Sequence, residues 1–171
     1  SEGIDLSLRT IINPGDEVIV LEPTFVSYSP LITLSGGVPV ALDTTDTGFL
    51  PDMKRLKQLI TPKTKAIMIC SPNNPTGAVI PKTLLAKIGK LAEKFDFWVI
   101  SDEIYAEICF DKSFCSFASL PNMKKRTILL NGFSKAFSMT GWRLGFMCAP
   151  KEVIDRALKI HQYSMMCAST P

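Results

Sequence analysis

The chain has 171 residues, of which 46% are hydrophobic and 20% are charged, and its formal net charge is +3 at pH 7. Such a chain is long and apolar enough for one buried core, which excludes disordered, collagen-like and coiled-coil proteins. Its 19 basic and 16 acidic side chains form no basic stripe, and no apolar run reaches membrane-spanning length, so we expect neither nucleic acid nor a membrane as a partner.

The amphipathic and apolar patterns alternate along the chain. The first predicted helix has Ile4, Leu8, Ile11 and Ile12 on one face, and a turn at residues 13–16 ends it. Apolar faces predict further helices at residues 53–60, 84–95 and 154–161. Short apolar runs predict strands buried on both faces at residues 18–21, 38–42, 66–70, 97–100, 127–130 and 144–148. This alternation predicts an α/β domain with a mostly parallel sheet and helices on both faces.

The cysteines and the single histidine indicate no metal site. The cysteine spacing fits neither a metal site nor a disulfide framework, and three cysteines lie in apolar, strand-like runs. We therefore expect a cytoplasmic protein with five reduced core cysteines: Cys70, Cys109, Cys115, Cys148 and Cys167. His161 lies at helical spacing from Ala157 and Leu158, which favours packing or a surface position over catalysis.

Polar clusters follow three of the predicted strands. They are Ser-Pro-Asn-Asn-Pro-Thr-Gly at residues 71–77, Ser-Asp-Glu-Ile-Tyr at 101–105 and Asn-Gly-Phe-Ser-Lys at 131–135. Taken singly, such clusters are typical of a turn, a helix cap or an exposed lysine. Because open α/β sheets bind ligands outside the carboxyl ends of their strands, three clusters at one edge predict a binding site.

The residue types in these clusters match the needs of pyridoxal phosphate. Lys135 offers an amine for the cofactor aldehyde. At the end of a buried strand its stem would be packed and its amine would point into a crevice, where desolvation would favour the neutral, nucleophilic form. Asp102 can keep the ring nitrogen protonated, while Tyr105 and Asn74 can donate hydrogen bonds to the ring oxygen. Arg143 presents a planar fork suited to the phosphate. The sequence contains no dinucleotide fingerprint, nucleoside-triphosphate loop or serine nucleophile elbow.

These motifs also occur in the order and spacing of a known family. The matching runs are residues 15–18, 71–77, 101–105, 134–135 and 139–143. On these runs the chain resembles the large domain of a class I pyridoxal-phosphate-dependent aminotransferase of fold type I. The resemblance covers residues 1–171 as one cofactor-binding large domain, without the family's N-terminal segment and C-terminal small domain.

The resemblance implies a role for each candidate catalytic residue. Lys135 would form a Schiff base with the cofactor and then carry the proton between the substrate α-carbon and C4′ of the cofactor. Asp102 would pair with the pyridine nitrogen. Tyr105 and Asn74 would hold the ring oxygen, and Asn74 would also contact the α-carboxylate of the substrate.

The resemblance implies further cofactor contacts. Arg143 and Ser134 would bind the phosphate, and Phe25 would stack on the ring. Ser1 and Glu2 resemble the end of a glycine loop that leads into a phosphate-binding helix N-terminus. One position departs from the pattern, because many members carry a serine three residues before the lysine, where this chain has glycine.

The function implied by the resemblance is transamination between an amino acid and a 2-oxo acid, in a full-length protein that is a homodimer. Residues 139–143 and 159–168 resemble bacterial aspartate, aromatic and N-acetyl-diaminopimelate aminotransferases, which implies a role in lysine or aspartate biosynthesis. Three alternatives remain open. They are a cystathionine β-lyase-like C–S lyase, an aminotransferase-like binding module of a transcriptional regulator, and a cofactor-binding fragment without activity of its own.

Overall fold

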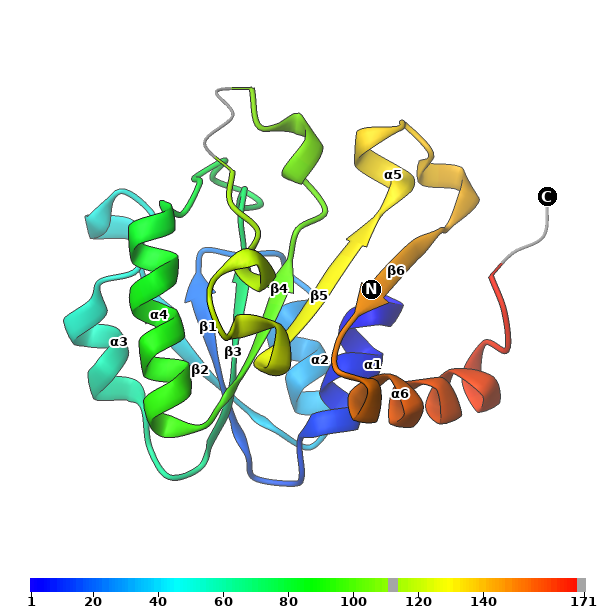
Figure 1. The fold of residues 1–171 in the computed structure, drawn as a ribbon, viewed down its shortest axis with the longest axis horizontal. Helices are drawn as coiled ribbons and strands as arrows, with labels where there is room; N and C mark the ends of the chain where they lie inside the picture. The colour runs from blue at the N-terminus through cyan, green and yellow to red at the C-terminus, as the bar shows by residue number, and fades with distance from the viewer. Residues whose placement is uncertain (111–113, 169–171) are drawn as a thin grey trace.

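The computed structural model describes residues 1–110 and 114–168, and these residues form a six-stranded sheet (Figure 1). The strand order is β2-β1-β3-β4-β5-β6. The five strands from β1 to β5 pair in parallel, and β6 runs antiparallel to β5. The strands are β1 (Glu17–Glu22), β2 (Val38–Asp43), β3 (Thr64–Cys70), β4 (Trp98–Asp102), β5 (Thr127–Gly132) and β6 (Gly145–Cys148). The predicted α/β class with a mostly parallel sheet is confirmed.

The helices include all four that the sequence pattern predicts and two that it does not. The α-helices are α1 (Glu2–Ile11), α2 (Tyr28–Leu34), α3 (Met53–Leu59), α4 (Lys82–Phe95), α5 (Phe133–Ala136) and α6 (Lys151–Ser164). Short 3₁₀ helices are η1 (Thr45–Thr47), η2 (Ala106–Ile108), η3 (Phe117–Ser119), η4 (Met123–Arg126) and η5 (Thr140–Trp142). The unpredicted α5 has only four residues, too few to show a helical period, and the seven residues of α2 bury only Tyr28 and Ile32. No helix in the described part of the chain is long and apolar enough to cross a membrane.

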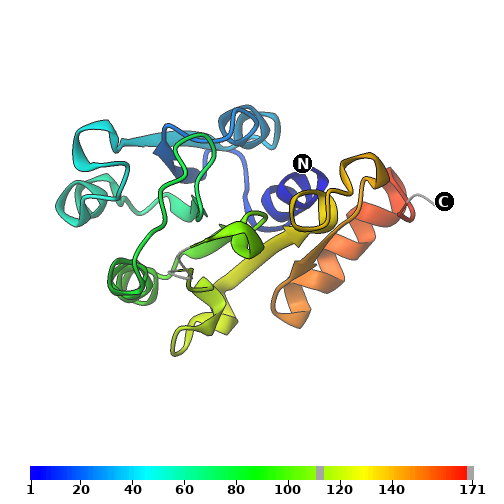
Figure 2. The same cartoon turned by 90° about the horizontal axis from the view of Figure 1, so that it is seen from above.

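Two apolar layers cover the two faces of the sheet. Along β1, Val18 and Val20 belong to one buried cluster and Ile19 and Leu21 to the other, because successive side chains of a strand point to opposite faces. Side chains of α1, α2 and α6 complete the first cluster, and those of α3 and α4 complete the second. Figure 2 shows α1 and α6 side by side on one side of the sheet, away from α3 and α4. The prediction of helices on both faces is therefore confirmed.

The sheet edges differ from the prediction of strands buried on both faces. Along β2 and β6 the side chains are mostly half-buried or exposed, and Phe146 is 46% exposed. The prediction of five core cysteines is wrong: Cys148 lies on the uncovered edge strand β6, and Cys109, Cys115 and Cys167 lie outside the sheet. Of the five cysteines, Cys70 alone is buried; Cys109 and Cys115 are half-buried, and Cys148 and Cys167 are exposed.

The topology brings the predicted functional segments together. The chain leaves β1 towards β2 at one edge, then crosses back to place β3, β4 and β5 on the other side of β1. The carboxyl ends of these four parallel strands therefore lie at one edge of the sheet. The strand order reverses between β1 and β3, and such a point is where open α/β sheets bind ligands.

Ile67 on β3 tests the central core. Its side chain is fully buried, so Ile67→Ala should lower the free energy of unfolding by about 2–5 kcal/mol through lost burial and a residual cavity. Urea denaturation measures this change. Leu34→Ala, at a position that is 73% exposed, is the control and should change stability by about 0.5 kcal/mol or less. Equal effects of the two substitutions would contradict this assignment of the core.

Candidate active site

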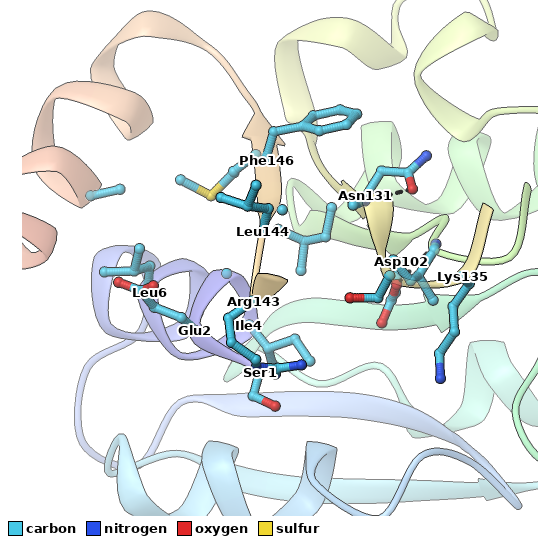
Figure 3. A pocket seen from close by; sticks show the side chains of 18 of the residues that line it. Ser1, Glu2, Ile4, Leu6, Asp102, Asn131, Lys135, Arg143, Leu144 and Phe146 are labelled. Carbon is cyan, nitrogen blue, oxygen red and sulfur yellow. Dashed lines mark hydrogen bonds between the residues drawn. The ribbon is translucent and has the colours of Figure 1, made fainter. Parts of the chain in front are cut away.

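A cavity of about 540 Å³ opens at the carboxyl edge of the sheet, between α1, α5, α6 and the ends of β4, β5 and β6 (Figure 3). Eight of the nine predicted cofactor residues line it: Ser1, Glu2, Phe25, Asp102, Tyr105, Ser134, Lys135 and Arg143. The ninth, Asn74, is not among the lining residues. Two of the three polar clusters, residues 101–105 and 131–135, therefore meet at the cavity, while residues 71–77 contribute no lining residue.

Asp102 ends β4 and is held by two hydrogen-bond donors. The Tyr28 hydroxyl donates to Oδ2 at 2.7 Å, and the Ile104 backbone N–H donates to Oδ1 at 3.2 Å. Burial raises the pKa of the Asp102 carboxyl, while the two hydrogen bonds act in the opposite direction. Because a buried carboxylate needs such donors to stay charged, the local structure supports an oriented anion at this strand end.

Lys135 lies in a different local structure from the one predicted. The sequence pattern places it at the end of a buried strand with its stem packed, whereas β5 ends at Gly132 and Lys135 lies on the single turn of α5 with an exposed side chain. Its Nζ is 5.8 Å from the centroid of the Tyr105 ring, within the range of a cation–π contact. The amine of Lys135 on α5 therefore lies near Tyr105, in the segment that follows β4.

The segment at residues 71–77 is folded by its own side chains. Asn73 Oδ1 accepts hydrogen bonds from the backbone N–H and the hydroxyl of Thr76, at 3.1 and 2.9 Å. Gly77 has a φ of +74°, which favours glycine at this point of the turn. Asn73 thus has a structural role. Burial raises the pKa of the Tyr105 phenol, and a hydrogen bond with the Asn74 side chain partly offsets this rise. Asn74 is therefore connected to the cavity through Tyr105.

The first turn of α1 forms another wall of the cavity. The Ser1 carbonyl accepts from the backbone N–H groups of Ile4 and Asp5, both at 3.1 Å, and the Ser1 side chain makes no capping hydrogen bond. In such a turn the N–H groups that come before these two have no acceptor within the helix and favour anions. Figure 3 shows Ser1 and Arg143 towards one end of the cavity, with Asp102 and Lys135 towards the other.

Arg143 is exposed at the carboxyl end of η5, and its backbone has a φ of +53°. Its guanidinium Nη1 donates to the carbonyl of Thr140 at 2.8 Å, within its own loop. Arg143, Ser134 on α5 and the first residues of α1 all line one cavity. This combination of a cation, a hydroxyl and a helix N-terminus is suited to a phosphate group.

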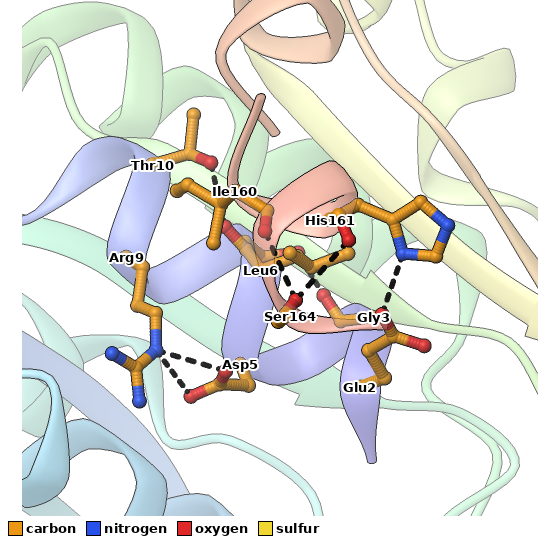
Figure 4. A network of polar contacts seen from close by, with 10 residues as sticks. Glu2, Gly3, Asp5, Leu6, Arg9, Thr10, Ile160, His161 and Ser164 are labelled. Atoms are coloured by element: carbon orange, nitrogen blue, oxygen red, sulfur yellow. Dashed lines mark hydrogen bonds and ion pairs between the residues drawn. The ribbon is translucent and has the colours of Figure 1, made fainter. Parts of the chain in front are cut away.

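His161 has a more specific place than the sequence pattern predicts. It lies on α6 and lines the cavity, and its Nδ1 is 2.7 Å from Glu2 Oε1 (Figure 4). The pair joins α6 to the first turn of α1 and draws the Glu2 carboxylate towards α6. Nothing in the sequence links residues 2 and 161, so this contact could not be predicted from spacing.

Several further cavity residues carry no recognisable signal in the sequence. The apolar end of the cavity lies between α1, β6 and α6 and includes Leu6, Leu144, Phe146, Ile154 and Leu158. Tyr28 contacts Asp102 from the first residue of α2, and only its position three residues after Phe25 could have drawn attention to it.

The whole chain, residues 1–171, matches the model of the family Aminotransferase class I and II. The chain belongs to this family. The resemblance found from the motifs is thereby confirmed.

The chain is similar to several named proteins. YugH of Bacillus subtilis (strain 168), provisionally named as an aminotransferase, is 54% identical over 169 residues, which are 98% of this chain and 44% of YugH. A protein of the same organism, provisionally named as an N-acetyl-LL-diaminopimelate aminotransferase, is 42% identical over 170 residues, or 99% of this chain and 43% of its own length. The solved aspartate aminotransferase from Thermus thermophilus with maleate has a TM-score of 0.94 at 41% identity and covers 98% of this chain and 44% of its own.

Two consequences follow from these comparisons. The chain spans less than half the length of these relatives. Their names favour the aminotransferase interpretation over a C–S lyase, which leaves transamination as the reaction to be tested.

The structure around Gly132 accounts for the departure of this chain from the family pattern. A Cβ at Gly132 would lie 2.9 Å from the Leu144 carbonyl oxygen and 3.1 Å from Gly145 Cα, which are backbone atoms of the opposite segment. β5 and β6 pair at this position, with Gly132 opposite Gly145. The close approach of the two backbones therefore requires glycine, and a serine would need β6 to shift.

Gly132→Ala tests this close approach. The added methyl group should lower the free energy of unfolding by about 1–3 kcal/mol, because the contacting atoms belong to the backbone and cannot turn away. Thermal and urea denaturation measure the loss. Gly141→Ala is a matched control, since a Cβ at Gly141 would meet no atom within 4 Å. A Gly132→Ala variant as stable as Gly141→Ala would contradict the crowding.

The raised pKa of Asp102 predicts a pH dependence of stability. Because the folded chain binds this proton more tightly than the unfolded chain, the contribution is fully present below the ordinary aspartate pKa and is lost as pH rises through the raised one. The free energy of unfolding of the wild type, measured relative to Asp102→Asn, should therefore fall with rising pH across that window. Urea denaturation at a series of pH values measures the difference.

The matched control is Asp155→Asn, which removes an exposed carboxylate on α6 and should keep the wild-type slope. A slope shared by the wild type and Asp102→Asn would show that burial leaves the proton affinity of Asp102 unchanged.

Proposed function

We propose that the protein containing this chain catalyses pyridoxal-phosphate-dependent transamination between an amino acid and a 2-oxo acid. One observation carries the proposal. A single cavity combines an amine on α5, a half-buried and hydrogen-bonded carboxylate at the end of β4, and a helix N-terminus beside an arginine. These are the three groups that the aldehyde, the ring nitrogen and the phosphate of the cofactor require.

The residues present fit pyridoxal phosphate in size and in chemistry. A cavity of about 540 Å³ lies within the range of sites for small cofactors. Asp102 accepts one hydrogen bond at each oxygen, and since each carboxylate oxygen has two lone pairs, the carboxylate can accept a further donor from the ring nitrogen. Phe25 is half-buried on the cavity wall, where its ring can cover a face of the cofactor.

Each side chain of the site would have its own binding or catalytic role. Bound pyridoxal phosphate supplies an electron sink for the bond that breaks at the substrate α-carbon. Asp102 would hold a proton on the ring nitrogen, and Tyr105 and Asn74 would donate to the ring oxygen. The Lys135 amine would anchor the cofactor covalently; once released by substrate, its Nζ would take the α-proton and return it. Asn74 would also contact the substrate α-carboxylate.

The phosphate would be held at the other end of the cavity. Arg143 and Ser134 would donate to its oxygens, together with the first turn of α1 at Ser1 and Glu2. The pairing of Glu2 with His161 supports this assignment, because it draws a carboxylate away from the place of an anion.

The substrates are proposed from the relatives. One similar protein is named for N-acetyl-LL-diaminopimelate and another for aspartate, which supports a role in lysine or aspartate biosynthesis. We also propose that the full-length protein is a cytoplasmic homodimer, as the family resemblance implies.

Lys135 tests the proposed function directly. Addition of pyridoxal phosphate to the purified chain should give a visible absorption band, and borohydride reduction followed by peptide mapping should place the cofactor on Lys135. Lys135→Ala should abolish this label. In a full-length parent with measurable turnover, the same change should lower transamination by about 10²–10⁴-fold or more, because the proton carrier is lost.

Lys151→Ala is the control, because Lys151 is an exposed lysine on α6 that pairs with Asp155. It should be labelled at Lys135 like the wild type. A label spread over surface lysines, or one that persists in Lys135→Ala, would contradict the assignment.

A further inference from the structure

Tyr28 supports Asp102 from behind the cavity and lies outside the predicted ligand set. Resting on the function proposed above, we propose that Tyr28 is a positioning residue: its hydroxyl fixes the Asp102 carboxylate in the orientation that pairs with the ring nitrogen of the cofactor. Tyr28 acts through Asp102 and does not itself line the cavity.

The geometry makes Tyr28 a rigid donor. Its side chain is fully buried at the first residue of α2, and its hydroxyl lies 2.7 Å from Asp102 Oδ2, a short distance that is typical of a hydrogen bond to a charged oxygen. The Tyr28 ring also packs edge to face against Phe25, with centroids 5.7 Å apart. One turn of chain therefore places Phe25 at the cavity wall and the Tyr28 hydroxyl on Asp102.

The electrostatics keep Tyr28 in its donor form. Burial, with the adjacent Asp102 charge as a second cause, raises the pKa of the Tyr28 phenol far above its ordinary range, so the hydroxyl stays protonated. At Asp102 two influences oppose each other. Burial raises the pKa of the carboxyl, and the hydrogen bond from the Tyr28 hydroxyl is the largest contribution that lowers it. Loss of this hydroxyl should therefore leave the carboxylate less well compensated and more easily protonated.

Other titratable groups around Asp102 come from several elements. Cys70 on β3 lies opposite Asp102 in the strand register, and burial raises the pKa of its thiol to about 12, so it is neutral at physiological pH. The amino terminus lowers the pKa of the Asp102 carboxyl. The other titratable or charged groups that neighbour Asp102 or share its cavity are Glu103, Tyr105, Lys135, Glu2, Arg143 and His161. Tyr28→Phe leaves all of them in place, which allows the effect of one hydroxyl to be measured.

The experiment compares Tyr28→Phe with the wild type and with Tyr163→Phe. Tyr163 is 93% exposed on α6, so it is a matched control for the loss of a tyrosine hydroxyl. In the chain without cofactor, the ¹³Cγ signal of Asp102 should titrate at a higher pH in Tyr28→Phe than in the wild type or Tyr163→Phe. With ¹⁵N-labelled pyridoxal phosphate, the ring-nitrogen shift of Tyr28→Phe should move towards the unprotonated form, and the dissociation constant should rise about tenfold.

A double-variant cycle separates positioning from packing. In an Asp102→Asn background, Tyr28→Phe should change the dissociation constant by about twofold at most, because the group through which it acts is gone. If Tyr28→Phe does not fold, 3-fluorotyrosine at position 28 keeps the hydroxyl as a stronger donor and should move the Asp102 titration to lower pH.

The two proposals fail differently. If the wild type shows no cofactor on Lys135, the proposed function is wrong, and the positioning role falls with it. If the wild type binds cofactor and the Asp102 titration and ring-nitrogen shift are the same in Tyr28→Phe, the positioning role alone is wrong. An equal effect of Tyr28→Phe in both backgrounds would also overturn it.

Discussion

The candidate site depends on keeping one carboxylate charged inside the protein. Asp102 lies at the end of a strand whose neighbours are apolar, and desolvation there favours its neutral form. Hydrogen bonds from Tyr28 and the Ile104 backbone oppose that tendency. The helix that carries Tyr28 and the segment that carries Ile104 must therefore both be in place before Asp102 can serve as a partner for a cationic ring.

The parallel sheet holds in place the segments that carry the hydrogen-bond donors to Asp102. Because β1, β3, β4 and β5 run in the same direction, the segments that leave their carboxyl ends converge from four separate stretches of sequence. The sheet core is buried on both faces and holds these strand ends in fixed register. By contrast, Lys135 and Arg143 lie on short, exposed turns beyond the sheet. One side of the cavity is therefore formed by the ends of buried strands and another by exposed turns.

The sequence predicted those features that depend on residues close to one another in the chain. Apolar runs located the strands, and polar residues at their ends located Asp102, Tyr105 and the cluster before Lys135, because strand direction and side-chain position are fixed by the same few residues. Contacts between distant segments could not be predicted in this way. Tyr28 is 74 positions from Asp102 and Glu2 is 159 positions from His161, and nothing in either segment specifies its partner. The short α5 also escaped detection, which is why Lys135 was expected at a strand end.

The spacing between Phe25 and Tyr28 has a consequence for how such a chain can evolve. The two aromatic rings pack on each other within one turn, and one faces the cavity while the other holds Asp102. An insertion or deletion in the connection from β1 to α2 would displace both at once, so the length of this connection is constrained by the cavity. The η1 connection after β2 has no residue in the cavity wall, and length variation among descendants should accumulate there instead.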